Sequence, residues 1–249
     1  MKLQAAAASD VGQQRKANED SSAVVEAHGF FSVCDGMGGH AAGQIASQLA
    51  CEALGKAIEV SASSGGSLTE RLRTAVLHAN HEIFTTAQRR PELAGMGTTV
   101  VALLVAGDRA ALAHVGDSRA YRLRAGRLRQ LTDDHSLVGE LLRRREISAD
   151  AAREHPHRHV LTRALGVRPR VEPDLAELGL QPGDVFVLCS DGLTNHVHDD
   201  EIAKVLSSRL APAEACERLI DLANARGGED NITVVLLRVE EEEGAETTA

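Results

Sequence analysis

The sequence predicts an α+β fold in which strands and helices form separate layers. Several short apolar segments have the length and composition of strands, and two long segments repeat their apolar residues at helical spacing. The two kinds of segment do not alternate along the chain. Grouped strands and paired helices are typical of α+β layers, whereas regular alternation would indicate a parallel sheet.

The expected helices follow from apolar periodicity and from their end signals. Segment 42–59 carries aliphatic residues at helical spacing. Ser67 and Glu70 form a capping box that opens a second helix, and we expect the two helices to pair antiparallel. A third helix, about 212–225, begins near a proline and ends before two glycines.

The expected strands are mostly continuous apolar runs, as in strands covered on both faces. They are 22–26, 29–34, 98–106, 110–115, 120–124, 184–189 and 232–239. Gly107, Asp108 and Arg109 join the third and fourth of these as a hairpin. Apolar periodicity weakens between 133 and 170, so we expect a partly helical surface flap there. Residues 240–249 form an acidic tail that we expect to be disordered, which leaves 1–239 as one domain.

Composition and charge exclude several classes of protein. With 43% hydrophobic residues, 249 residues can bury a core without disulfides. A net charge of −9 and few aromatic residues disfavour nucleic acid as a partner. The longest aliphatic run is too short to span a membrane, and no secretory signal is visible. We therefore expect a cytoplasmic monomer in which Cys34 and Cys189 are buried and unpaired.

Four aspartates stand where an apolar strand meets a loop. Asp35, Asp117 and Asp191 follow apolar runs, and Asp230 precedes one. If these strands are neighbours, the carboxylates converge and repel one another unless a cation compensates them. All-oxygen sites suit Mg²⁺ and Mn²⁺, and pairs of such ions serve in phosphate ester hydrolysis. Taken alone, each aspartate is equally well explained by turn chemistry, but four together favour a metal centre.

The motifs of this chain, taken in order, resemble those of the PP2C (PPM) family of protein phosphatases in its bacterial form. They occupy 9–12, 15–20, 35–40, 95–99, 116–119, 190–193 and 229–233, which covers nearly the whole chain. The resemblance implies two antiparallel β-sheets packed face to face and flanked by antiparallel helix pairs. It also implies a protein serine/threonine phosphatase with two core Mn²⁺ or Mg²⁺ ions and a weaker third.

The resemblance assigns the core ligands residue by residue. Asp35 would bridge the two core ions, with the Gly36 carbonyl as a further ligand. Asp191 and Asp230 would complete the first site, and Glu19 resembles the ligand that reaches the second ion through water.

The resemblance also places two outer groups. Asp20 would be a ligand or a group behind the ligands, and Asp117 resembles the ligand of the third ion, shared with Asp191. Some relatives carry a further aspartate where this chain has Asn195, so the third site is expected to be weaker here.

The resemblance further suggests how the reaction proceeds. A water shared by the two ions would lose a proton near neutral pH and attack phosphorus in line. Arg15 resembles the arginine whose planar fork holds two phosphate oxygens. His40 is a candidate general acid, or else a structural histidine of its glycine-rich loop. As a general acid, its replacement by alanine should slow phosphoserine hydrolysis more than aryl phosphate hydrolysis. Expected partners are phosphorylated proteins and a serine/threonine kinase.

Four alternatives remain beside this hypothesis. Segment 36–41 matches a dinucleotide fingerprint, although no second parallel strand is expected after it. His155, His157 and His159 could bind zinc, but their spacing favours a solvated surface. The arginines of 143–145 suit either a solvated helix face or an acidic substrate segment. The fourth alternative is an inactive relative that only binds phosphoproteins, which the intact acidic positions disfavour.

Overall fold

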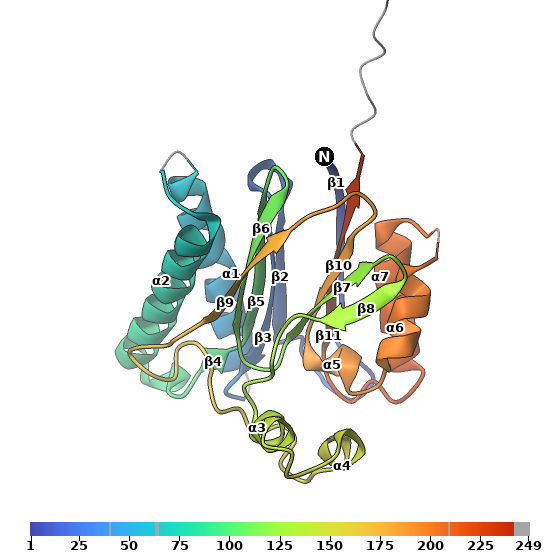
Figure 1. Cartoon of the computed structure of the whole chain (residues 1–249). Helices are drawn as coiled ribbons and strands as arrows, with labels where there is room; N and C mark the ends of the chain where they lie inside the picture. Colours follow the sequence, from blue (N-terminus) through green and yellow to red (C-terminus); the bar gives the residue numbers. More distant parts are fainter. Residues whose placement is uncertain (40, 63–64, 209, 242–249) are drawn as a thin grey trace, which may run out of the picture.

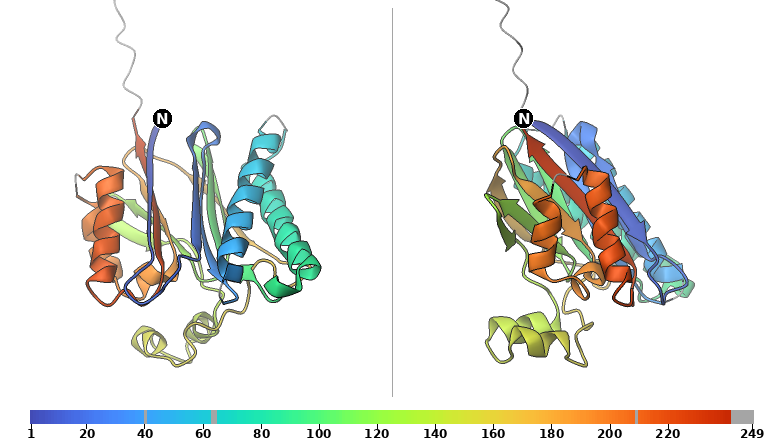
Figure 2. Two further views of the ribbon diagram at one scale, coloured as in Figure 1. Left: turned by 180° about the vertical axis from the view of Figure 1, so that it is seen from behind. Right: turned by 90° about the vertical axis from the view of Figure 1, so that its right-hand side faces the viewer.

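The computed structural model describes residues 1–39, 41–62, 65–208 and 210–241 (Figure 1). Two β-sheets pack face to face and helices cover the outer face of each, which gives a four-layer α-β-β-α sandwich (Figure 2). Every strand pairing in the described ranges is antiparallel. The predicted fold class is therefore confirmed. The dinucleotide-binding alternative is excluded, because that fold needs a parallel sheet.

The first sheet contains strands from both ends of the sequence. Its order is β1 (Lys2–Asp10), β11 (Ile232–Glu240), β10 (Val185–Cys189), β7 (Arg119–Arg124) and β8 (Arg127–Gln130). β1 pairs with β11 along its whole length, from Lys2 opposite Glu240 to Asp10 opposite Ile232. The segment after β1 and the segment before β11 therefore leave the sheet at the same end.

The second sheet contains the strand that carries Asp35. Its order is β2 (Asp20–Val25), β3 (Phe30–Met37), β5 (Val100–Ala106), β6 (Arg109–Val115) and β9 (Asp174–Gly179), with β4 (Gly97–Thr98) also paired to β3. β3 runs beyond its predicted end at residue 34, so Asp35 and Gly36 lie within the strand. Asp20 is the partner of Asp35 in β2, and Thr98 is the partner of Gly36 in β4.

Helices cover both outer faces of the sandwich. α1 (Ala41–Ser61) and α2 (Leu68–Arg89) pack against the second sheet, while α5 (Asp191–Thr194), α6 (Asp199–Leu206) and α7 (Pro212–Asn224) pack against the first. The side chain of Ser67 accepts a hydrogen bond from the Glu70 N–H, as the capping box predicts. The short 3₁₀ helices are η1 (Glu26–His28) and η2 (Pro91–Leu93).

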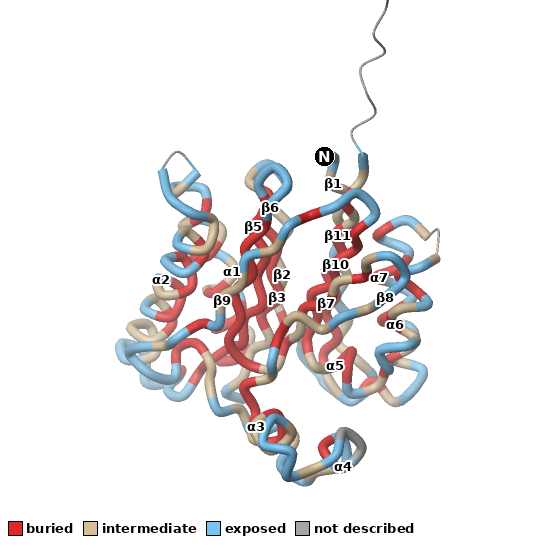
Figure 3. The backbone as a smooth tube through the Cα atoms, in the orientation of Figure 1, coloured by how far each residue is buried: buried red, intermediate tan, exposed pale blue. Residues whose placement is uncertain are grey.

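The core lies in three layers: one between the sheets and one between each sheet and its helices (Figure 3). The layer between the sheets is mainly aliphatic, with Phe31 and Phe186 as its aromatic members. Cys34 and Cys189 are buried and free, as predicted. None of the helices in the described part of the chain is long and apolar enough to cross a bilayer.

Three strands were absent from the prediction, namely β1, β8 and β9. β1 is rich in alanine, which has little preference for strands, and it becomes a strand because β11 offers a free edge. β8 is short and polar, and β9 alternates between exposed and half-buried residues. Glu240, assigned to the tail, instead ends β11, whereas 242–249 lie outside the described residues.

The segment predicted as a flap projects from one end of the sandwich (Figure 1). It contains two short helices, α3 (Leu137–Arg143) and α4 (Ala149–Arg153). Both ends of the segment are tied to the body by backbone hydrogen bonds. The His135 N–H donates to the Gly116 carbonyl (2.7 Å), and Leu165 and Thr98 exchange two bonds (2.8 and 3.2 Å).

Candidate metal centre

Most of the predicted site residues meet in one cavity of about 280 Å³ at the flap end of the two sheets. Its lining includes Arg15, Glu19, Asp35, Gly36, Asp117, Asp191 and Asp230. Asp35 comes from the second sheet, whereas Asp191 and Asp230 flank strands of the first sheet. The cavity therefore joins the two sheets. His40 lies outside the described residues.

Three half-buried carboxyl groups of the cavity, those of Asp35, Asp117 and Asp191, hold their protons more tightly than free carboxyl groups. Burial raises the pKa of Asp35 well above its usual range, and the nearby carboxylates, with that of Asp20 the strongest, raise it further. Burial also raises the pKa of Asp117 and of Asp191, with additional repulsion from Asp191 and Asp230 respectively. Mutual repulsion of this kind is the condition that a bound cation relieves.

The donor atoms of the cavity fit a hard divalent cation. They are carboxylate and carbonyl oxygens, without nitrogen or sulfur from the predicted ligand residues. One buried oxygen of Asp191, Oδ1, has no hydrogen-bond partner in the described part of the chain. Mg²⁺ and Mn²⁺ prefer such oxygen ligands, so the residues present suit the ions that the sequence predicts.

Glu19 is placed by contacts of its backbone and by a glycine in α1. Its N–H donates to Oδ1 of Asn231 (2.7 Å), and its carbonyl accepts from the Gly36 N–H (3.2 Å). A Cβ atom at Gly43 would collide with Oε2 of Glu19 and approach the Gly36 backbone at 2.9 Å. Because Gly43 has no side chain, the Glu19 carboxylate can occupy the space beside α1.

Arg15 stands at the cavity on a half-exposed side chain. Its Nη2 lies 2.7 Å from Oδ2 of Asp230, which makes a salt bridge. The guanidinium is therefore next to Asp230, one of the predicted metal ligands.

Asp20 lies behind the cavity and is not part of its lining. Burial is the largest effect that raises its pKa, to about 7, and Asp191 and Asp230 raise it as well. The hydroxyl of Ser190 donates to Oδ2 of Asp20 (2.8 Å), while Oδ1 has no partner among the described residues. Of the two predicted roles for Asp20, this position favours a group behind the ligands.

Several supporting residues escaped the sequence prediction. The amide of Asn231 donates to the carbonyls of Val11 and Ala17 (both 2.9 Å), which fixes the loop that carries Arg15 and Glu19. In the sequence, the only indication of this role is that Asn231 directly follows the predicted ligand Asp230. Asn231 thus connects the first sheet to the N-terminal loop.

Two threonines at the junction of β4 and β5 hold the backbone of Asp35. The Asp35 N–H donates to Oγ1 of Thr99 (2.9 Å), and Oγ1 of Thr98 donates to the Asp35 carbonyl (2.8 Å). Both threonines belong to a motif noted in the sequence, but no role was predicted for them.

The flap contributes one residue that was predicted to be solvated. His159 lines the cavity, and its Nδ1 lies 4.0 Å from Oδ2 of Asp191. The same oxygen accepts from the amide of Asn195 (3.1 Å), at the position where some relatives carry aspartate. In the described ranges, His155, His157 and His159 do not form a group of converging metal ligands.

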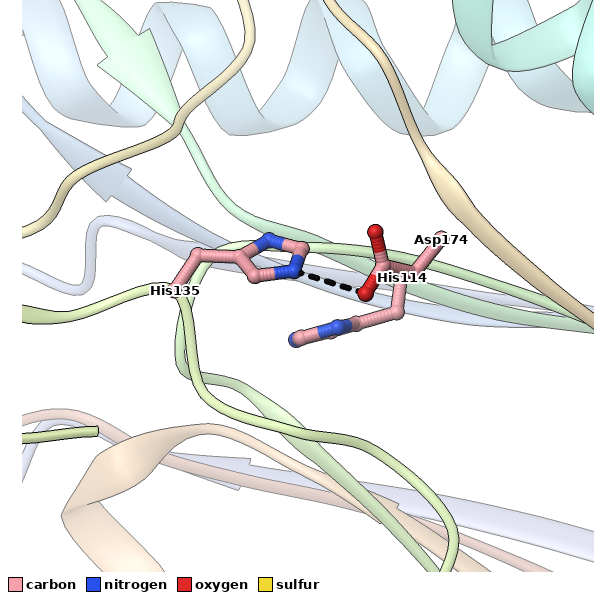
Figure 4. Close-up of side chains that lie close together, drawn as sticks. All are labelled: His114, His135 and Asp174. Atoms are coloured by element: carbon pink, nitrogen blue, oxygen red, sulfur yellow. Dashed lines mark ion pairs between the residues drawn. The ribbon is translucent and has the colours of Figure 1, made fainter. Parts of the chain in front are cut away.

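A separate group of possible ligands consists of His114, His135 and Asp174 (Figure 4), with one atom of each lying within 4.8 Å of the others. Among the described residues, no three carboxylates of the cavity have oxygen atoms this close together, as expected because like charges repel. The Gly116 N–H donates to Nδ1 of His135 (3.1 Å), so in the neutral ring the proton is on Nε2, which lies 3.1 Å from Oδ2 of Asp174. His135 therefore lacks a free lone pair for a metal. We interpret the group as a support for the turn that carries Asp117.

Comparisons with known proteins show to which family this chain is related. A family model described as Protein phosphatase 2C matches residues 8–232. Serine/threonine phosphatase Stp of Listeria monocytogenes is 43% identical over 233 residues, which are 92% of each chain. Serine/threonine protein phosphatase PstP of Mycobacterium tuberculosis is 43% identical over 237 residues, 95% of this chain and 45% of that protein.

Solved structures show the same fold. The crystal structure of the M. tuberculosis phosphatase PstP superposes with a TM-score of 0.89 at 42% identity, covering 96% of this chain and 99% of that one. A structure of the PstP catalytic domain in complex with two manganese ions gives a TM-score of 0.88 at 41% identity, with the same coverage. In that relative, a chain of this fold holds two manganese ions.

Proposed function

This chain belongs to the protein phosphatase 2C family, and from that premise we propose how its own residues perform the family's reaction. It is a metal-dependent protein serine/threonine phosphatase that uses Mn²⁺ or Mg²⁺ at a two-metal centre. The observation that carries the residue assignment is the convergence of Asp35, Asp191 and Asp230 from two sheets in one cavity beside Arg15.

The carboxylates have distinct positions with respect to the ions. Asp35 lies at the junction of the two sheets, which suits a ligand shared by both ions, and the Gly36 carbonyl is next to it. Asp191 and Asp230 would hold one ion, and Glu19 would serve the other. When bound, the two ions lower the pKa of a water molecule and offset the charge of the phosphoryl group.

Asp117 and Asp20 have secondary roles in the proposal. Asp117 faces the cavity next to Asp191, and these two residues suit the weaker third ion. Asn195 supplies a neutral amide at that position and donates to Asp191, which reduces the charge available to the third ion. Asp20 supports Ser190 and Asp35 from behind.

Arg15 binds the substrate phosphate. With Asp230 engaged as a metal ligand, the guanidinium of Arg15 would exchange this carboxylate for two phosphoryl oxygens. Such an arrangement orients phosphorus and offsets charge in the transition state. His40 remains the sequence-based candidate for the proton donor to the leaving alkoxide.

The decisive experiment is hydrolysis of a phosphothreonine peptide after chelation, with Mn²⁺ or Mg²⁺ added back. We expect activity to return with the metal in the wild type and to fall at least about a hundredfold in Asp35→Ala, since even groups behind a metal ligand contribute 10–100-fold. Asp221→Ala, an exposed aspartate of α7, is the matched control and should retain activity. Full activity in chelator, or an active Asp35→Ala, would contradict the assignment.

We further propose that the substrates are proteins phosphorylated by a serine/threonine kinase in the cytoplasm and that the enzyme acts as a monomer. Light scattering coupled to gel filtration measures the oligomeric state, and release of phosphate from an autophosphorylated kinase domain measures the activity. A stable dimer would contradict the proposed monomer. Failure to release phosphate from the autophosphorylated kinase domain would contradict a kinase as substrate.

A further inference from the structure

A groove of about 270 Å³ adjoins the catalytic cavity on the side of the second sheet. It shares Met37 and Leu161 with the cavity, so a peptide chain can pass from one to the other. The remaining lining comes from residues 162–172, which follow the flap helices. We call this site the arginine groove, because Arg163, Arg168 and Arg170 line it.

The charge of the arginine groove is opposite to that of the whole chain. Arg163 forms a salt bridge with Asp174, in which Nη1 lies 2.7 Å from Oδ1. Arg168 and Arg170 are exposed, and no salt bridge to either is found among the described residues. Among the described residues, Glu172 is the single acidic member of the lining. The groove is therefore positive on a protein of net charge −9, which favours acidic ligands and repels basic ones.

The wall that carries Arg168 is fixed to the body of the protein. Asn80 of α2 is 2% exposed; its amide oxygen accepts from the Gly166 N–H (2.9 Å) and its amide nitrogen donates to the Arg168 carbonyl (3.1 Å). Leu165, which precedes Gly166, exchanges two backbone hydrogen bonds with Thr98. The groove is thus formed before any ligand arrives, which reduces the entropic cost of binding.

The same wall has a direct connection to the metal centre. Thr98, which pairs with Leu165, donates through Oγ1 to the carbonyl of Asp35 (2.8 Å). A substrate segment in the groove therefore has a defined position relative to the predicted bridging ligand. Val167, which is 50% exposed, adds an apolar contact for the bound segment.

The cavity on the other side of the metal centre has a different charge pattern. It measures about 230 Å³ and contains Asp117, Asp134, Asp191 and Asp199 together with three arginines. Two of these arginines are paired with acids, Arg119 with Asp134 (2.7 Å) and Arg158 with Glu229 (3.4 Å). Acidic side chains of a substrate are therefore drawn to the arginine groove and not to this cavity.

We propose that the arginine groove binds acidic residues next to the phosphorylated residue of the substrate, so that the enzyme prefers phosphoproteins with acidic flanking sequence. This substrate class rests on the proposed phosphatase function. The ligand is an aspartate- or glutamate-containing stretch of the same polypeptide that carries the phosphate. Its carboxylates meet Arg168 and Arg170 while the phosphate meets Arg15.

The test compares phosphothreonine peptides that carry glutamate or lysine within a few positions on either side of the phosphorylated residue. Values of kcat/KM with Mn²⁺ are measured for the wild type, for Arg168→Glu/Arg170→Glu, and for Arg218→Glu on the exposed face of α7 as the matched control. Hydrolysis of p-nitrophenyl phosphate, which has no flanking residues, reports the chemistry alone.

We expect the wild type and Arg218→Glu to prefer the acidic peptide by about three- to tenfold, which lies within the range of about two- to thirtyfold for two solvent-exposed ion pairs. The double variant should lose or reverse this preference and retain p-nitrophenyl phosphate hydrolysis. High salt should weaken the preference, because it screens exposed charges.

A wild type without preference, or a double variant that keeps it, would overturn the proposal. If the wild type hydrolysed neither peptide nor p-nitrophenyl phosphate, the phosphatase function itself would fail. Binding of the same peptides, measured by fluorescence anisotropy, would then decide on the groove: tighter binding of the acidic peptide supports it, and equal binding refutes it.

Discussion

At the scale of single residues, Asp20 shows how burial sets the charge of this site. Burial, together with Asp191 and Asp230, raises the pKa of Asp20 to about 7, whereas an aspartate in an unfolded chain titrates near 4. Between about pH 4 and pH 7 the folded state therefore binds the extra proton. The resulting contribution to stability is present at low pH and is lost as the pH rises toward 7.

We accordingly expect the metal-free protein to become less stable as the pH rises from 5 to 8. The contribution of Asp20 is at most about 4 kcal/mol, since one pKa unit corresponds to about 1.4 kcal/mol. Asp20→Asn, which mimics the protonated acid, should flatten the dependence, whereas Asp221→Asn should not. Thermal unfolding in chelator over this pH range measures the effect, and identical slopes for Asp20→Asn and the wild type would refute it.

At the scale of elements, α1 approaches β3 so closely that two glycines share the contact. A Cβ atom at Gly36 would meet the Gly43 carbonyl, and one at Gly43 would meet Glu19 and the Gly36 backbone. Gly55, on the same helix, faces open space. Gly43 and Gly55 therefore provide a test position and a matched control on the same helix.

For Gly43→Ala we expect kcat/KM to fall at least about tenfold at low Mn²⁺, because the new methyl group displaces Glu19. Gly55→Ala should leave activity unchanged and stabilise the helix by about 0.5–1 kcal/mol. Kinetics at several Mn²⁺ concentrations and thermal unfolding measure both variants. Wild-type kinetics for Gly43→Ala would show that the Glu19 carboxylate does not need this space.

At the scale of the whole molecule, strands from the two ends of the sequence pair with each other in the first sheet. β1 pairs with β11 over nine residues, and α7 packs on both strands. The loop between β1 and β2 then carries Arg15 and Glu19 to the cavity. An edge strand at the N-terminus is therefore part of both the fold and the site.

Deletion of residues 2–10 should prevent folding. The lost ladder, at about 1 kcal/mol for each hydrogen bond, is comparable to the 5–15 kcal/mol that stabilises a typical domain. Deletion of 242–249 should change neither stability nor activity, as expected if 1–239 is the catalytic domain. Circular dichroism and phosphatase assays of both deletions test this, and a folded, active protein without β1 would be the contrary outcome.

Helices and strands with a strong local sequence pattern were predicted, whereas a strand that forms only by pairing with a neighbouring strand was missed. α1 and α7 have clear periodicity or end signals and were predicted to within a few residues. For α2, the capping box correctly predicted the start of the helix. β1 was missed because a run of alanines carries no strand signal until it meets the edge of β11.

The sequence by itself determined the chemistry of this protein: which carboxylates are available, that each adjoins an apolar strand, and that their order matches one phosphatase family. Only the tertiary structure decided how they meet. Asp35 comes from one sheet and Asp191 and Asp230 from the other. The supports of Asn231 and Asn80 reach across 212 and 86 residues of sequence. Local patterns record burial and turn preference, whereas contacts between distant residues exist only once the sheets have packed.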